Sequence, residues 1–141
     1  MANPLVVIAA NTHPMVKRRR IELRDLSNQR FILRERGSGT RMAVDAHFRH
    51  VKFKPDVRLE MGSNEAIKEA VAGALGIAVI SSHALHGQAT EYGVSMLSVN
   101  GFPVSSSWHV VHLKGKLLSP IARVFQQHLL TQAAPRRIPR A

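Results

Sequence analysis

The chain has 141 residues, no cysteine and a formal net charge of +11 at pH 7. This length accommodates one domain whose core can fold without covalent cross-links, and the lack of cysteine excludes disulfides, cysteine metal sites and thiol catalysis. The apolar run Leu5–Ala10 follows no basic residues and is too short to cross a bilayer, so the sequence predicts a cytoplasmic protein without signal peptide or membrane helix.

Apolar runs and helical spacing divide the chain into strands and helices. A continuous apolar run indicates a strand covered on both faces, and apolar residues three and four apart indicate a helix with one buried face. In chain order the patterns predict strand Pro4–Ala10, strand Phe31–Arg34, helix Thr40–His50, strand Val57–Met61, a helix opening at residues 63–64, strand Ile77–Ile80, a hairpin-like segment Met96–Val104, strand Trp108–Leu113 and helix 119–130. This alternation is typical of an α/β fold.

The predicted helix Thr40–His50 has one apolar and one charged face. Val44 and Phe48 stand four positions apart and are expected to face inward. Asp45 and Arg49 have the spacing of an ion pair on the exposed side.

Residues 60–82 contain the central unit, in which a polar turn, an amphipathic helix and a buried strand follow one another. Ser63 or Asn64 can cap the helix by accepting a backbone N–H of its first turn. Gly76 is expected to adopt the left-handed conformation just past the helix, before the strand Ile77–Ile80. The apolar stripe of the helix comprises Ile67, Ala70, Val71 and Ala74.

The rest of the chain is less regular. Residues 82–91 predict a polar loop, and Pro103 restricts the second half of the hairpin-like segment to a sheet edge. Ser119 followed by proline is a strong helix start. The stripe of the helix comprises Ile121, Val124, Phe125, His128 and Leu129. The basic tail 131–141 is expected to be disordered.

The first candidate for a functional site is the stretch Gly37-Ser38-Gly39-Thr40-Arg41 between a predicted strand and a predicted helix. Backbone N–H groups converge at such a helix start, hydroxyl groups flank them, and the helix dipole presents its positive end. This arrangement can bind a small anion, although it lacks the spacing of a Walker A loop. The alternative is a tight turn with a capped helix and no ligand.

The second candidate is Gly62-Ser63-Asn64, another helix start after a predicted strand, with a simple helix cap as the alternative. Strand ends of a parallel sheet point the same way, so both turns are expected on one edge, where ligands bind in open α/β folds. The predicted site comprises Ser38, Gly39, Thr40, Gly62, Ser63 and Asn64.

The sequence favours neither a metal site nor catalysis. The histidine pairs His47/His50, His83/His86 and His109/His112 stand three apart, but no glutamate completes a metalloprotease frame. Ser38 lies outside a Gly-x-Ser-x-Gly frame, and nothing indicates a carboxylate pair. We therefore expect no catalytic residue, no metal and no cofactor.

Positive charge is concentrated in the first 54 residues, including the run Lys17–Arg20, and in the tail. Such charge attracts nucleic acids or small phosphorylated and carboxylated molecules. The chain has few aromatic residues to stack on bases, so charge alone is weak evidence for nucleic-acid binding.

Several stretches together resemble the effector-binding domain of LysR-type transcriptional regulators, and in particular the regulators of carbon-fixation (RuBisCO) operons. They are residues 31–41, 63–81 and 101–120, supported by 4–9 and 13–14. The resemblance covers about residues 3–130. It departs from the family in having no winged helix-turn-helix, no linker helix and only part of a first lobe, and in placing Ala74 where family members have glycine.

The resemblance implies a periplasmic-binding-protein-like (type 2) fold with a Rossmann-like, mostly parallel sheet and flanking helices, whose effector lies between two lobes. Residues 15–105 would form the second lobe, 5–10 and 108–113 the crossover strands, and 119–130 a helix of the incomplete first lobe. Carried over residue by residue, the effector side of this lobe is again Ser38, Gly39, Thr40, Gly62, Ser63 and Asn64.

The function implied is an effector-sensing fragment that binds a small phosphorylated or carboxylated anion. DNA would be bound only by a winged helix-turn-helix that this chain lacks, and a membrane not at all. Three apolar faces shaped for the first lobe would be bare, which favours a homodimer, with a swap of the final helix as one way to form it. They are Leu5–Ala10, Trp108–Leu113 and Ile121–Leu130. The alternative function is a basic nucleic-acid-binding accessory protein that acts through residues 17–41 and the tail.

Overall fold

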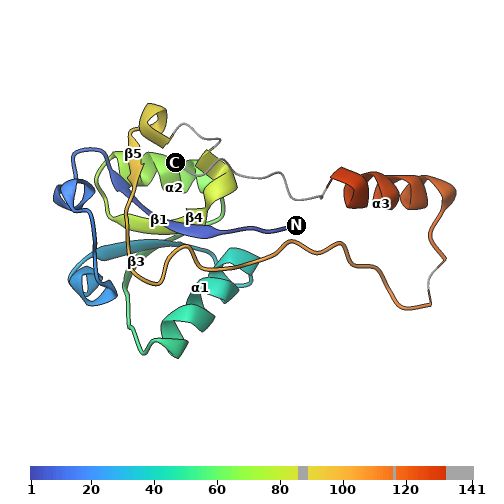
Figure 1. The fold of residues 1–141 in the computed structure, drawn as a ribbon, viewed down its shortest axis with the longest axis horizontal. Helices are drawn as coiled ribbons and strands as arrows, with labels where there is room; N and C mark the ends of the chain where they lie inside the picture. Colours follow the sequence, from blue (N-terminus) through green and yellow to red (C-terminus); the bar gives the residue numbers. More distant parts are fainter. Residues whose placement is uncertain (86–88, 116, 133–141) are drawn as a thin grey trace. The chain divides into compact units, whose positions relative to one another are not determined.

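The computed structural model describes residues 1–85, 89–115 and 117–132 (Figure 1). The chain forms two compact units: one is Asn3–Ser106, and the other joins Met1–Ala2 to the segment that begins at Ser107. No helix in the described residues is long and apolar enough to cross a membrane.

The unit Asn3–Ser106 is a five-stranded mixed sheet with helices on both faces, which confirms the predicted α/β class. The strand order is β3-β2-β4-β1-β5. β2 is parallel to β3 and β4, whereas β1 is antiparallel to β4 and β5. The strands are β1 (Leu5–Ala10), β2 (Arg30–Arg34), β3 (Asp56–Met61), β4 (Ile77–Ser81) and β5 (Val94–Met96); the helices are α1 (Gly39–His50) and α2 (Asn64–Ala72).

Short 3-10 helices occupy the connections: η1 (Pro14–Lys17), η2 (Leu23–Leu26), η3 (Ser82–Leu85) and η4 (Ala89–Tyr92). The loop predicted over residues 82–91 thus contains two helical turns in its described part. Lys68 of α2 holds both, because its buried ammonium donates to the carbonyl of Ala84 (3.0 Å) and lies 3.9 Å from the ring centre of Tyr92.

The core consists of two clusters, one on each face of the sheet. Alternate residues of a strand point to opposite faces, so the apolar residues of β1 and β4 contribute to both. The α1 side chains Val44 and Phe48 cover one face (Figure 1). Three members of the predicted stripe of α2, Ile67, Ala70 and Val71, cover the other, whereas the fourth, Ala74, lies beyond the helix and is exposed. The ring of Phe48 packs 5.7 Å from that of Phe31 and 5.0 Å from that of Phe53.

The end of α2 differs from the prediction. The helix ends at Ala72, and the left-handed residue is Ala74 (φ 59°) instead of Gly76. The N–H groups of Ala74 and Leu75 donate to the carbonyls of Val71 (2.9 Å) and Ala70 (3.1 Å), which closes the helix before the last member of the predicted stripe. Gly76 is required for another reason: a Cβ there would lie 2.5 Å from the carbonyl oxygen of Arg30.

The predicted hairpin Met96–Val104 is wrong. β5 pairs with β1, Val99 forms a bridge with Ile21, and Val104 forms a bridge with Leu5. The two halves of the segment therefore pair with other parts of the chain, a choice that depends on neighbours distant in sequence.

In the second unit, the predicted strand Trp108–Leu113 is not formed among the described residues. Trp108 exchanges backbone hydrogen bonds with Met1, but residues 109–113 join no ladder, and Val111 is 84% exposed. The predicted C-terminal helix is confirmed as α3 (Pro120–Gln132), with Ser119 Oγ accepting from the N–H of Ala122 (3.2 Å). The predicted disorder of 131–141 falls largely on residues 133–141, outside the described part of the chain.

Candidate functional site

The two turns identified from the sequence lie on the same edge of the sheet, as parallel-strand geometry predicted. β2 and β3 are adjacent and parallel, and their last residues, Arg34 and Met61, are paired. The N–H of Glu35 donates to the carbonyl of Met61 (3.2 Å), which joins the strand ends where both turns begin. We call this edge, with residues 35–40 and 60–65, the carboxyl-end edge.

The first turn opens α1 with a serine cap. Ser38 has an extended backbone, and its Oγ accepts from the N–H of Arg41 (3.4 Å) while its carbonyl accepts from the N–H of Met42 (2.9 Å). The N–H groups of Gly39 and Thr40 find no acceptor in the part of the chain that the structure describes. Two donors at the positive end of the helix dipole are thus available.

The second turn opens α2 in the same way. Ser63 Oγ accepts from the N–H of Ala66 (3.1 Å) and its carbonyl accepts from the N–H of Ile67 (3.2 Å), which leaves the N–H groups of Asn64 and Glu65 without a described acceptor. The side-chain oxygen of Asn64 is buried and also lacks a partner among the described residues. The predicted caps are confirmed, and each turn retains free donors.

The space above both turns is open. A Cβ built on Gly37, Gly39 or Gly62 meets no described atom within 4 Å. Only Gly37 needs glycine for its conformation (φ 93°), because the other two have ordinary φ values. A small molecule can therefore approach both backbones.

Arg41 is the main charged residue under this edge, and it is bound within the protein. Its side chain is buried, donates to Asp45 (3.0 Å) and to the carbonyl of Arg34 (2.8 Å), and forms an ion pair with Glu60 (2.9 Å). Burial opposes the charged form, but the hydrogen bonds to Glu60 and Asp45 outweigh it and raise the pKa of Arg41 above its ordinary value. The predicted pair Asp45–Arg49 is wrong, because Asp45 turns toward this buried cation instead.

The other arginines of this edge, Arg34 and Arg36, also lie beside carboxylates. Arg34 donates twice to the Glu35 carboxylate (2.8 and 2.9 Å); this pairing raises the pKa of Arg34 and lowers that of Glu35. Arg36 is exposed and lies 3.9 Å from Glu60. An anion at this edge would therefore be held by backbone N–H groups and hydroxyls, with little help from guanidinium groups.

Sequence reasoning missed the neighbouring end of β4. Ser81 Oγ contacts Asn3 Oδ1 (2.5 Å) and accepts from the N–H of His83 (3.2 Å), and the N–H of Ser82 donates to the carbonyl of Pro4 (2.9 Å). Asn3 and Ser81 are both buried. This network fixes the end of β4 at the same edge. The sequence indicated it only through a serine at the end of the apolar run of β4.

No group of three or more histidines and carboxylates converges among the described residues; His86 of the pair His83/His86 lies outside them. His47 packs on Phe102 with ring centres 5.2 Å apart, and its buried Nε2 has no hydrogen-bond partner in residues 1–85, 89–115 and 117–132. Desolvation, followed by the nearby His50, lowers the pKa of His47.

The family model described as the LysR substrate binding domain matches residues 1–134. The HTH-type transcriptional activator CmpR of Synechocystis is 44% identical over 129 residues, and a RuBisCO operon transcriptional regulator of Acidithiobacillus ferrooxidans is 40% identical over 132. These matches cover 92% and 94% of this chain but 42% and 43% of the relatives, so the chain spans less than half their length.

Solved structures show the same fold. The regulatory domain of Synechocystis CcmR, in complex with 2-PG, superposes with a TM-score of 0.85 at 42% identity, over 94% of this chain and 64% of that one. The effector-binding domain of QuiR, in complex with shikimate, superposes with a TM-score of 0.75 at 24% identity, over 93% and 61%. The second likeness shows the fold alone.

Proposed function

The chain belongs to the LysR substrate-binding domain family, and from this premise we propose that it is the effector-sensing part of a carbon-fixation transcriptional regulator. A sensor must bind a small molecule without transforming it. The carboxyl-end edge suits this task, because it offers hydrogen-bond donors instead of a nucleophile with an adjacent base.

The observation that carries the proposal is the pair of helix starts that share one edge. Each has a serine cap and free N–H groups in its first turn, and the positive ends of two helix dipoles meet there. We infer that the effector is a small phosphorylated or carboxylated anion. Its contacts would be Ser38, Gly39, Thr40, Gly62, Ser63 and Asn64.

The relative CcmR supports this class of ligand, since its regulatory domain has been solved with 2-PG bound. At 42% identity over nearly the whole chain, 2-PG is a reasonable first probe. Affinity is expected to be modest, because a site that supplies donors from few segments gains less free energy than one that encloses its ligand.

The test is titration calorimetry with 2-PG and with inorganic phosphate, on the wild type and on the variant Ser38→Asp/Ser63→Asp. Aspartate caps a helix as well as serine does, so the fold should be retained. Its negative charge would lie where the anion binds and should weaken binding about tenfold or more.

The matched control is Ser119→Asp, since Ser119 caps α3 by the same hydrogen bond. This variant should bind like the wild type. Equal affinity of the wild type and the double variant would contradict the proposed site, and absence of saturable binding by any small phosphate or carboxylate would contradict the proposed function.

We further propose that the regulator acts in the cytoplasm and recognises its operator through a helix-turn-helix, the motif for which several relatives are named. In this assignment the residues of the carboxyl-end edge bind effector and perform no catalysis. Measured turnover of the effector by the purified chain would contradict it.

The expectation that Leu5–Ala10 would be bare is wrong, because β1 is buried between β4 and β5. We propose self-association through the apolar face of α3. Ile121, Val124 and Phe125 are 82%, 69% and 60% exposed, and with Pro120 and His128 they line a hollow of about 480 Å³. An apolar surface of this kind is usually covered by protein. A second copy of the chain would cover both faces at once in an isologous contact.

Sedimentation velocity over a range of concentrations tests this association. Val124→Asp should shift the chain to monomer, whereas Gln127→Asp, at an exposed polar position of the same helix, should not. A wild-type mass that stays monomeric at every concentration would contradict the proposal.

A further inference from the structure

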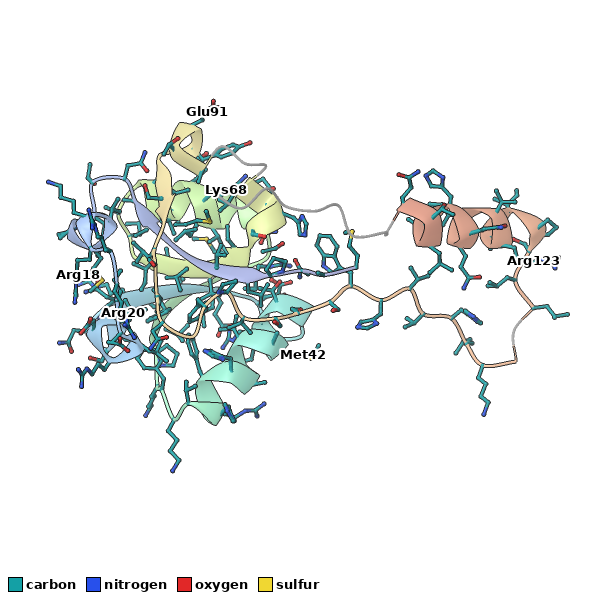
Figure 2. All side chains as sticks on the ribbon, viewed as in Figure 1. Arg18, Arg20, Met42, Lys68, Glu91 and Arg123 are labelled. Atoms are coloured by element: carbon teal, nitrogen blue, oxygen red, sulfur yellow. The ribbon has the colours of Figure 1, made fainter. Side chains whose placement is uncertain are left out.

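The basic residues of the first half of the sequence gather at the edge opposite the candidate site. The loops that lead into β2 and β3 all lie at the starts of these parallel strands, and Arg30 and Asp56 are paired there. We call this surface the amino-end basic surface; it comprises Lys17, Arg18, Arg19, Arg20, Arg24, Arg30, Lys52 and Lys54. Met42 lies in the first turn of α1, near the candidate site. Figure 2 shows Arg18 and Arg20 at the end of the unit that is away from Met42.

Most of this charge is not neutralised within the protein. Arg18 pairs with Asp25 (2.8 Å) and Arg20 pairs with Glu22 (3.2 Å). The remaining members of the surface are exposed and form no ion pair with any residue that the structure describes. A cluster of exposed, unpaired cations at one edge repels itself and is available to an anionic partner.

The loops that carry these cations are held in place. Ile21 forms a bridge with Val99, and Asn100 Nδ2 donates to Glu22 (3.1 Å). The loop with Lys52 and Lys54 is anchored by Phe53, whose ring packs 5.8 Å from that of Phe31. The surface is therefore formed before any partner binds, which reduces the entropic cost of binding.

A cavity of about 340 Å³ opens within this surface and is lined by Arg19, Arg20 and the loop Ser98–Phe102. Two arginines and the polar residues Ser98 and Asn100 are thus among its lining residues, and of the two arginines Arg20 is paired with Glu22. Guanidinium groups hold phosphate oxygens through paired hydrogen bonds, so Arg19 at this cavity can bind a phosphate group.

The composition of the surface distinguishes between anionic partners. A protein partner requires an apolar centre depleted of charge, whereas the large apolar side chain exposed here is Val51, at the C-terminal end of α1. Single-stranded nucleic acid requires aromatic stacking platforms, whereas the rings of Phe53 and Phe102 at this surface pack against the core through Phe48. The repeated phosphates of a duplex need only spaced cations.

We propose that the amino-end basic surface binds the phosphate backbone of duplex DNA without sequence preference. The surface lies at the opposite edge of the sheet from the two helix starts, so the same unit can hold an effector and a duplex at once. Such contact would attract the sensor unit to DNA and orient it there, without reading the bases.

The experiment is fluorescence anisotropy with a labelled duplex of arbitrary sequence, on the full chain, at several salt concentrations. The test variant is Arg19→Gln/Arg24→Gln/Arg30→Gln, which removes three exposed cations of the surface. It should lower affinity, and it should reduce the slope of log affinity against log salt by about 2 to 3. Thermal melting should match the wild type, because none of these side chains has a described partner.

The matched control is Arg136→Gln/Arg137→Gln/Arg140→Gln, which removes the same charge from the tail. Equal slope changes in the two variants would overturn the proposal, because charge number and not position would then decide binding. Binding of polyglutamate or single-stranded DNA as tight as that of the duplex would also overturn it. The affinity for 2-PG should be the same in the wild type and in Arg19→Gln/Arg24→Gln/Arg30→Gln. This measurement separates a loss of DNA binding from a failure of the proposed effector site.

Discussion

The two edges of one sheet use arginine in opposite ways. At the carboxyl-end edge, Arg34 and Arg41 are paired with carboxylates and support the backbone. At the amino-end edge, Arg19, Arg24 and Arg30 are exposed and form no ion pair with any residue that the structure describes. The edge with the most basic residues is therefore not the edge with the helix starts.

Burial explains the difference. Arg41 is 8% exposed, and a buried cation must be paired because its lost hydration is otherwise uncompensated. The exposed arginines keep their hydration and need no partner. Net charge in a sequence thus indicates attraction to anions, while the location of a specific small-anion site depends on backbone geometry.

The largest expected effect comes from glycine substitutions at the two edges. Gly76→Ala places a Cβ 2.5 Å from the carbonyl oxygen of Arg30, where β4 meets β2 at the amino end. It should destabilise the fold by about 3 kcal/mol or more. Gly62→Ala, in open space at the carboxyl end, should change the unfolding free energy by less than about 1 kcal/mol. Urea denaturation measures both free energies of unfolding. Similar losses in the two variants would contradict the expected difference between a crowded and an open glycine position.

Arg41→Gln compared with Arg19→Gln tests the paired and unpaired arginines directly. Removing the Arg41 guanidinium leaves Asp45, Glu60 and the carbonyl of Arg34 without their donor, which should cost about 2 kcal/mol. Arg19→Gln should stay within about 0.5 kcal/mol of the wild type. A small loss for Arg41→Gln would mean that water replaces its contacts.

The left-handed residues of the two edges differ in type. Gly37, at the carboxyl end, is suited to its φ of 93°, whereas Ala74, before β4, has a φ of 59°. Ala74→Gly should therefore stabilise by up to about 1 kcal/mol, and Gly37→Ala should destabilise by a similar amount. Thermal unfolding measures both, and a destabilised Ala74→Gly variant would show that chain entropy outweighs relief of strain.

The smallest expected effect is a pH dependence in the last turn of α1. His47 has a lowered pKa in the folded state because its ring is desolvated and lies near His50. The unfolded chain therefore binds more protons near and below pH 6.5, so stability should fall as pH decreases through this range. In His47→Gln this part of the slope should disappear. If the unfolding free energy of His47→Gln still falls as in the wild type between pH 7 and 5, the pH dependence arises from other groups.

Local patterns predicted the elements that depend on near neighbours in sequence. The apolar runs of β1 and β4, the inward pair Val44 and Phe48, and the caps Ser63 and Ser119 are as expected. Parallel order then placed Ser38 and Ser63 on one edge. Each of these inferences uses a period or a hydrogen bond that spans a few residues.

Errors occurred where partners are distant in sequence. Asp45 has two basic neighbours at helical spacing, Arg41 and Arg49, and burial beside Glu60 decides for Arg41. Met96–Val104 resembles a hairpin, but β1 and Ile21 provide the pairing. A sequence pattern cannot show which of two possible partners is preferred. The free energy of each ion pair or strand pairing depends on how far water is excluded from it in the folded chain.

The sequence by itself determined the α/β class, the order of most elements and the two capped turns, because periodicity and local hydrogen bonding are properties of short segments. The family followed separately, from the resemblance of residues 31–41, 63–81 and 101–120 to a known family. Only the tertiary structure decided that the basic loops lie at the opposite edge from those turns, and that the arginines beneath the turns are neutralised. Both depend on strand direction and burial, which bring together residues that the sequence keeps apart.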